Sequence, residues 1–369
     1  MSAPANGGRL QPRNQAAAAD LVRQARAEGW SLGSPAADRQ WDLSRLQQVS
    51  LFNPADMLLT VETGLSLRKI KQIAAAENLW LPLDSPIPDL PLADLLARDA
   101  SLSWLSHRHG LARDRVMSLT ALDDQGQAVY SGARVVKNVA GYQLAPLYIG
   151  AWHSLGPVME VSFRLSPQPS SLTTVSLEAA DHGPLLKLWT RSRSGESAAS
   201  LGPPWEALLI KRRAGQWQLR GFTAAPRERT LGWIEAAGNG IQANVAVVNQ
   251  PPDEADEVAS KASILIQVLP SQIVDLLAAL VPAGIDLICY PSAGAVLLVP
   301  TADSTGDQPF RAALRSAQAW GGRVRPLSLE GATTLDEVGI HEQPPAVMQR
   351  VKQILDPDRV FGPWPEQLW

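Results

Sequence analysis

Three of the five histidines could serve as acid–base groups, because an imidazole titrates near neutral pH. His107 and His109 lie in the string Ser-His-Arg-His-Gly, and His153 follows Trp152 further along the chain. The simpler interpretation of the first two, which the sequence favours, is that they are exposed loop histidines. Two histidines without a fixed third ligand do not define a metal site, and we predict no bound metal.

Two adjacent polar residues, Lys137 and Asn138, lie in a segment that could contact a ligand. From Gly132 to Tyr142 the chain reads Gly-Ala-Arg-Val-Val-Lys-Asn-Val-Ala-Gly-Tyr. Gly141 has no Cβ, so the backbone there can approach a ligand closely. The alternative is that Lys137 and Asn138 form a structural pair that caps a loop.

Composition excludes several classes of protein. Charged residues are 19% of the chain and the formal net charge is −3, without a basic patch of the kind that binds nucleic acid. The single cysteine, Cys289, lies in an apolar run, which is typical of a buried core residue. One cysteine permits no disulfide within the chain and argues against a cysteine-ligated zinc or iron–sulfur centre. The sequence shows no nucleophile elbow, Walker loop or Rossmann fingerprint, so catalytic residues remain unknown.

The hydropathy pattern predicts a cytoplasmic protein. No apolar stretch of signal-peptide type begins the chain, and no segment offers the roughly 18 apolar residues that a membrane helix needs. We therefore expect no direct membrane insertion, and any peripheral membrane contact would come through partner subunits.

The elements that position the candidate residues can be placed by hydrophobic periodicity. We predict a helix over 14–29, a strand over 58–61, a helix from Ser66 to Asn78 and a strand over 79–83. A strand–helix–strand unit of this kind normally makes parallel strands. Further on we predict a helix over 92–106, a hairpin of strands over 116–122 and 128–130, and a strand over 158–165.

Prolines at 167 and 169 suggest a boundary near residue 170. Beyond it, strands are expected near 206–211, 217–222, 263–268, 285–290 and 295–299, with helices near 182–193, 227–237, 270–281 and 308–320. Closely spaced strand pairs separated by helices favour an antiparallel sheet with helices on one face.

Several strings together resemble the FAD-binding subunit of glycolate oxidase, in the wider vanillyl-alcohol-oxidase-like superfamily with the FAD-binding PCMH-type domain. The most specific is Lys137-Asn138-Val139-Ala140-Gly141-Tyr142, followed by Ser154-Leu155-Gly156 and Glu160. Asn53-Pro54, Glu62-Thr63-Gly64 and the closing Lys352, Asp356-Pro357 and Phe361-Gly362-Pro363 agree in order. The resemblance covers residues 14–170 clearly, 341–369 well, and the stretch between them only in general terms.

The resemblance implies an α+β fold and four segments. These are a flexible lead over 1–13, a PCMH-type domain of two α/β subdomains over 14–170, a cap-like α+β domain over 171–340, and a C-terminal segment over 341–369 that returns to the FAD domain. It implies that Lys137, Asn138, Gly141 and Tyr142 line the flavin ring, and that Ser154, Leu155, Gly156 and Val158 run along the cofactor. It also implies hydride transfer from a small 2-hydroxy acid to FAD, and partner flavoprotein and iron–sulfur subunits.

The chain departs from the family pattern where the pyrophosphate would bind. The family's glycine-rich opening loop reads Gly33-Ser34-Pro35-Ala36-Ala37 here, and a second glycine-rich stretch reads as the helix-like string over 91–96. Pro157 removes a backbone donor, and His153 adds bulk where the family has glycine. Asp94 would repel phosphate if it lay nearby. The alternative function is therefore a non-catalytic scaffold subunit that keeps the flavoprotein fold without FAD.

Overall fold

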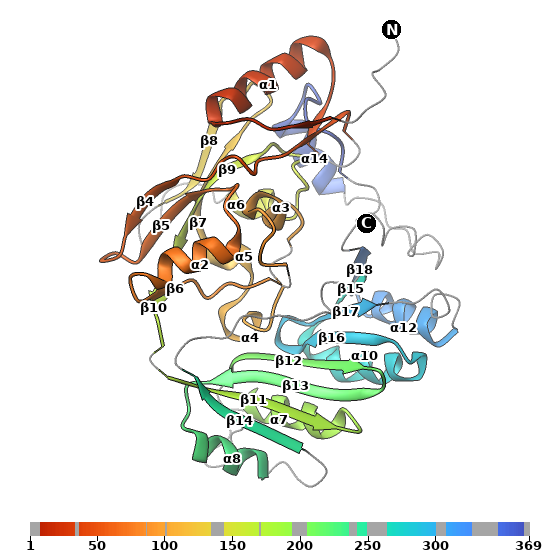
Figure 1. Cartoon of the computed structure of the whole chain (residues 1–369). Coiled ribbons are helices and arrows are strands. Elements are labelled where there is room, and N and C mark those ends of the chain that lie inside the picture. The colour runs from red at the N-terminus through yellow and green to blue at the C-terminus, as the bar shows by residue number, and fades with distance from the viewer. Residues whose placement is uncertain are drawn as a thin grey trace.

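The computed structural model describes residues 8–33, 37–85, 87–99, 102–133, 144–169, 171–193, 205–235, 242–248, 264–299, 308–326 and 346–364. Its described part arranges into an upper body, which contains the first half of the chain together with α14 (Ala346–Leu355), and a lower body built on one large sheet (Figure 1). Lys137, Asn138, Gly141 and Tyr142 lie outside the described residues.

The chain begins with one helix and a small parallel sheet. Helix α1 (Gln15–Glu28) starts where the Asn14 side chain accepts a hydrogen bond from the Ala17 N–H at 2.8 Å, and it ends at Gly29, whose φ is +73°. Both ends are standard caps, which is why the predicted helix has nearly the expected bounds. The sheet contains β1 (Arg9–Leu10), β3 (Arg39–Trp41) and β2 (Leu32–Gly33), in that spatial order.

A five-stranded antiparallel sheet forms the centre of the upper body, in the order β4-β5-β9-β7-β8. Its strands are β4 (Val49–Asn53), β5 (Leu58–Glu62), β7 (Val116–Leu122), β8 (Ala128–Gly132) and β9 (Val158–Arg164). The predicted β7–β8 hairpin is confirmed. Strand β9 is buried on both faces, because helices cover it on one side and the N-terminal unit on the other.

The predicted parallel strand–helix–strand unit is wrong. Helix α2 (Leu67–Ala75) starts at Ser66, whose side chain accepts from the Lys69 N–H as expected. The strand after it is only β6 (Leu79–Trp80), which pairs antiparallel with β10 (Ser166–Pro167) in a separate sheet. The Leu83 N–H donates a hydrogen bond to the Leu81 carbonyl at 2.8 Å, and this tight turn ends the strand.

Of the predicted helix over 92–106, only the first part is helical, and the next helix begins where the predicted one was to end. Helix α3 (Leu92–Ala97) ends just before Asp99, whose φ of +50° no α-helix accommodates. Helix α4 (Ser106–His109) and helix α5 (Ala112–Arg115) follow as single turns, and α6 (Ala145–Tyr148) is another.

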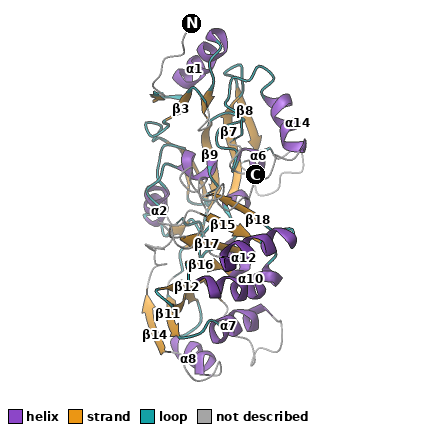
Figure 2. Ribbon diagram, turned by 90° about the vertical axis from the view of Figure 1, so that its right-hand side faces the viewer, coloured by secondary structure: helices purple, strands orange, loops and turns teal. Residues whose placement is uncertain are grey.

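The lower body is one eight-stranded antiparallel sheet, in the order β14-β11-β13-β12-β16-β17-β15-β18. Its strands are β11 (Leu172–Ala179), β12 (Trp205–Arg213), β13 (Gln216–Thr223), β14 (Gln242–Val248), β15 (Ile264–Gln267), β16 (Asp286–Tyr290), β17 (Ala295–Val299) and β18 (Arg323–Pro326). Its helices α7 (Gly183–Arg193), α8 (Arg227–Glu235), α10 (Ile273–Leu280) and α12 (Gln308–Ala319) lie on one face (Figure 2). The predicted antiparallel sheet with helices on one face is confirmed, and the strands β11, β14 and β18 were not predicted.

The other face of this sheet packs against the upper body. Trp80, Trp104 and Leu105 form a buried apolar cluster with Phe222 and Tyr290 of the sheet. The Trp104 and Phe222 rings meet edge to face with centroids 5.3 Å apart. Because both faces of the sheet are covered at its centre, the strands β12, β15, β16 and β17 carry nearly continuous apolar runs.

The C-terminal segment returns to the N-terminal unit. Leu32 pairs with Phe361 in a parallel bridge, with the Leu32 N–H donating to the Val360 carbonyl and the Gly362 N–H donating to the Leu32 carbonyl. The Lys352 ammonium of α14 donates to the Ser154 carbonyl at 2.5 Å, to the Phe361 carbonyl at 2.9 Å and to the Asp356 carboxylate. A buried charge pair with every donor used holds the segment in place.

Within the described ranges, no helix combines the length and the apolar character that a membrane crossing requires.

Replacing Lys352 by Met should cost about 3–5 kcal/mol of unfolding free energy, because Asp356 would keep its charge in a buried position without its partner. Denaturant unfolding followed by circular dichroism measures the loss. Arg26→Met is the matched control, since Arg26 and Asp358 form a pair with 42% and 45% exposed side chains, and its loss should stay within about 1 kcal/mol. Equal losses in the two variants would contradict the assigned role of Lys352.

Candidate ligand-binding site

A cavity of about 360 Å³ opens between the small parallel sheet, α3 and the turn over 150–153. Its polar lining consists of Arg9, Gln40, Asp42, Ser44, Asp94, Arg98 and His153. Gly33, the first residue of the predicted pyrophosphate loop, also lines it. The cavity therefore lies where the family resemblance places the phosphates of a dinucleotide.

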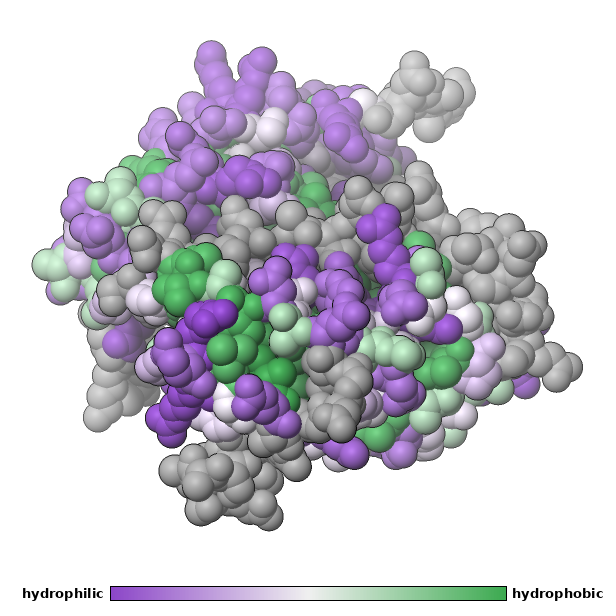
Figure 3. Space-filling model, turned by 60° about the horizontal axis from the view of Figure 1, so that its bottom comes forward, coloured by the Kyte–Doolittle hydropathy of each residue, from purple (hydrophilic) through white to green (hydrophobic). Residues whose placement is uncertain are grey.

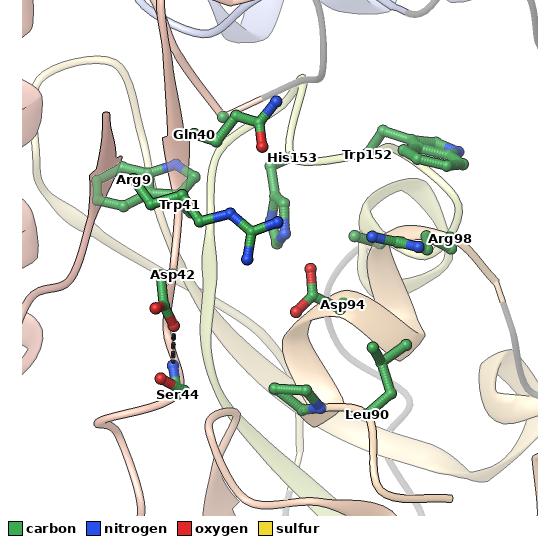
Figure 4. A pocket seen from close by; sticks show the side chains of 13 residues that line it. Arg9, Gln40, Trp41, Asp42, Ser44, Leu90, Asp94, Arg98, Trp152 and His153 are labelled. Carbon is green, nitrogen blue, oxygen red and sulfur yellow. Dashed lines mark hydrogen bonds between the residues drawn. The ribbon is translucent and has the colours of Figure 1, made fainter. Parts of the chain in front are cut away.

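Helix α3 is fixed at both ends by backbone hydrogen bonds. Its first N–H groups, from Leu92 and Ala93, donate to the Leu65 and Thr63 carbonyls at 2.8 and 2.7 Å. At its other end, the Leu96 and Ala97 carbonyls accept from the N–H groups of Gly150 and Trp152 at 2.8 and 2.9 Å. This arrangement directs Asp94 into the cavity and leaves these helix-end donors engaged within the protein (Figure 4).

The turn after α6 has a strained backbone. Trp152 and His153 have φ values of +49° and +60°, a backbone conformation that residues other than glycine adopt rarely. His153 is only 8% exposed. Burial, aided by the positive charge of Arg98, lowers the pKa of His153 to about 4, so the imidazole is neutral at physiological pH.

Asp94 is the carboxylate at the centre of the cavity. Burial raises the pKa of Asp94 against the opposing influence of Arg98 and Arg9. In Figure 4 its carboxylate points toward the His153 ring and the Arg9 guanidinium. The Arg98 guanidinium lies over the Trp152 ring, 5.4 Å from its centroid, and lines the same space.

Ser154, Leu155, Gly156 and Val158, the described residues of the predicted cofactor site, are buried beside this cavity. The N–H groups of Ser154 and Gly156 donate to the Ala151 and His153 carbonyls, and the Ser154 hydroxyl donates to the Pro363 carbonyl at 3.0 Å. At Gly156, with φ +114°, a Cβ would lie 2.1 Å from the Leu122 carbonyl oxygen. These residues join the turn to the C-terminal segment, and their cofactor role stays a prediction.

His107 and His109 are not exposed loop residues. The His107 ring lies 2.8 Å from the Ser292 hydroxyl, which also accepts a hydrogen bond from Trp189. The His109 ring meets Trp80 edge to face and lies 3.4 Å from Glu206. Both histidines therefore connect α4 to the eight-stranded sheet, away from the cavity, and they do not meet His153.

Known proteins resemble this chain in sequence over part of its length. No family model matches the chain. It is 33% identical over 128 residues to the mitochondrial cytochrome-linked D-lactate dehydrogenase of Arabidopsis thaliana, covering 35% of this chain and 22% of that one. It is 30% identical over 158 residues to the D-2-hydroxyglutarate dehydrogenase of Xanthomonas citri, with coverages of 42% and 33%.

The glycolate oxidase subunit GlcE of Escherichia coli is 25% identical over 152 residues, which are 40% of this chain and 42% of that one. The matches thus span between about a fifth and two fifths of these relatives' lengths. They confirm the resemblance to glycolate oxidase subunits that the sequence strings predict.

Solved structures match nearly the whole chain. An alkyldihydroxyacetonephosphate synthase superimposes with a TM-score of 0.66 at 11% identity, over 97% of this chain and 76% of that one. The predicted α+β fold of the PCMH type with a cap-like sheet domain is confirmed. The likeness to these dehydrogenases and to this fold supports FAD as the cofactor of proteins of this type.

The described residues around the cavity do not fit a dinucleotide's pyrophosphate. Phosphate oxygens need free N–H donors at close range. The N–H groups of Ala93, Trp152, Ser154 and Gly156 are not free, because each donates to a backbone carbonyl of the chain. The Asp94 carboxylate faces the same space and would repel a phosphate when ionised. The cavity is also small for a whole dinucleotide, since pockets for smaller ligands already occupy about 300–1,000 Å³.

Sequence reasoning anticipated Asp94 and His153 but missed Arg9 and Gln40. Both project from short strands of the parallel sheet, and strands of two or three residues leave no periodicity to detect. No group of three or more potential metal ligands lies together among the residues that the structure describes.

Acidification should destabilise the protein through His153. An unfolded histidine binds a proton near pH 6.5, whereas the folded chain keeps His153 neutral down to about pH 4. The unfolded state therefore binds more protons between these values, and stability falls as the pH falls, by about 3 kcal/mol at pH 4. Urea unfolding at pH 7 and pH 4 of the native protein and of His153→Asn measures the difference. Identical pH dependence in both proteins would exclude a neutral, buried His153.

Proposed function

We propose that the chain is a subunit of a 2-hydroxy-acid-oxidising assembly of the glycolate oxidase type, and that it serves there as a non-redox, structural subunit. The observation that carries this proposal is the replacement of a phosphate cradle by the Asp94 carboxylate and the buried His153 ring. Backbone N–H groups that are already hydrogen-bonded within the chain cannot also donate to a pyrophosphate.

The assembly itself is inferred from the relatives. Their names describe glycolate oxidase subunits and dehydrogenases of D-lactate and D-2-hydroxyglutarate. We infer an assembly in which a second subunit of the same fold carries the cofactor. In that assembly this chain would supply contact surface and a stable frame, while the flavoprotein and iron–sulfur partners would carry the electrons.

A contact surface for partners is available on the lower body. Strand β14 lies at one end of the eight-stranded sheet and pairs with β11 on one side. Val247 in this strand is 55% exposed. The lower face shows groups of hydrophobic side chains among hydrophilic ones (Figure 3), as surfaces that meet partners often do.

A second candidate function is the FAD-bearing redox subunit, favoured by the string from Lys137 to Tyr142. Bound FAD would accept a hydride from the α-carbon of a 2-hydroxy acid. Under this alternative Lys137, Asn138, Gly141 and Tyr142 would line the flavin ring. Arg9 and Arg98, which line the cavity, would then have to offset the charge of the phosphates.

The visible absorption of the purified full chain separates the two candidates. We expect a colourless protein that takes up no stoichiometric FAD after incubation with an excess and gel filtration, because the backbone N–H groups described around the cavity are bonded within the chain and the Asp94 carboxylate faces it. The matched positive control is a glycolate oxidase flavoprotein subunit handled in parallel. A yellow protein with one FAD per chain, bleached by glycolate, would instead establish the redox subunit.

The assembly is tested by co-expression with the flavoprotein and iron–sulfur subunits of the same organism. We expect a complex that survives gel filtration, and glycolate-dependent dye reduction that falls when this chain is left out. Unchanged activity and no co-elution would rule out the structural role.

A further inference from the structure

The cavity beside α3 contains two opposite charges that the protein does not use. In the part of the chain that the structure describes, neither the Arg9 side chain nor the Asp94 side chain makes a hydrogen bond or ion pair. Asp94 nevertheless senses the positive charge of Arg9 and Arg98 through space. Asp94 is partly buried, and a carboxylate in such a position without a hydrogen-bond partner is less favourable than one that meets a bound donor.

The neighbouring charges, in contrast, are already engaged. The Asp42 carboxylate accepts from the Gln11 side chain at 2.9 Å and from the Ser44 N–H at 3.1 Å. The Arg98 guanidinium stacks over Trp152. The free functions of the cavity are therefore one guanidinium donor, one carboxylate acceptor and the neutral polar groups of Gln40 and His153, arranged around a common space (Figure 4).

We propose that this cavity binds a small zwitterion of the α-amino acid type, with its carboxylate toward Arg9 and its ammonium toward Asp94. Such a ligand has no net charge, and it satisfies both unused charges at once. A hydroxy acid would bring a carboxylate but no cationic group for Asp94, and a phosphate would face Asp94 directly. The cavity of about 360 Å³ is ample for a molecule of this size.

The proposal goes beyond the structural-subunit function and does not depend on it. A chain that failed to join any assembly would still have the same cavity. A chain that bound FAD across this cavity would have no room for the amino acid, so FAD uptake would overturn the inference as well.

A panel of the twenty protein-forming amino acids, followed by isothermal titration calorimetry on the full chain, tests the site. We expect at least one to bind, and glycolate and methylamine, each lacking one of the two charges, to bind at least about tenfold more weakly. Absence of binding by every amino acid at millimolar concentration overturns the proposal. Equal binding of glycolate overturns the role given to the ammonium group.

Two variants assign the binding to the named charges. Arg9→Gln and Asp94→Asn should each weaken the binding amino acid at least about tenfold. Asp89→Asn is the matched control, because Asp89 pairs with Arg68 on the surface outside the cavity, and it should bind as the native chain does. Thermal melting checks folding, and Asp94→Asn should melt no lower than the native chain, since it removes an unpaired carboxylate. Undiminished binding by the Asp94→Asn variant would contradict the proposed site.

Discussion

A single ammonium group holds together parts of the chain that lie far apart in sequence. Lys352 reaches the Ser154 carbonyl, the Phe361 carbonyl and the Asp356 carboxylate from one position on α14. Asp356 in turn accepts from the N–H groups of Val360 and Phe361. The turn that contains Trp152 and His153 is thereby tied to α14 through the carbonyl of the next residue, Ser154. The shape of the cavity at its other face follows from this network.

That turn shows how a fold can keep its frame while the chemistry it presents changes. Backbone N–H groups and side chains compete for the same volume at a ligand site, because a Cβ and its substituents occupy the space that a phosphate oxygen would need. Here Asp94, His153 and Trp152 line that volume, and the N–H groups of Ala93, Trp152, Ser154 and Gly156 bond within the protein. The change needs no rearrangement of the five-stranded sheet.

The sequence predicts the strongly patterned elements well. Helix α1, the β7–β8 hairpin and the lower antiparallel sheet all follow from caps, turns and long apolar runs. It fails where a few residues in unusual backbone conformations decide the outcome. Asp99 stops the helix expected over 92–106 after its first part, and the turn at Leu83 ends β6 early. Local periodicity carries no information on either feature.

The candidate site was only partly predictable for the same kind of reason. Asp94 and His153 stand out because they replace glycines expected from the family resemblance. Arg9 and Gln40 reach the cavity through the pairing of β1 with β3, a contact between segments some thirty residues apart that no local pattern reveals. The role of His107 and His109 in joining α4 to the sheet likewise depends on residues near 206 and 292.

The pairing of Leu32 with Phe361 has a consequence for how the protein is made. During synthesis the N-terminal unit emerges from the ribosome long before the segment that completes it, so Leu32 and the turn at Ser154 must wait for α14 with their partners missing. The eight-stranded sheet is encoded between these two parts, and all its strands are available earlier. Completion of the upper body must therefore follow synthesis of the segment over 346–364, after every strand of the eight-stranded sheet has been made.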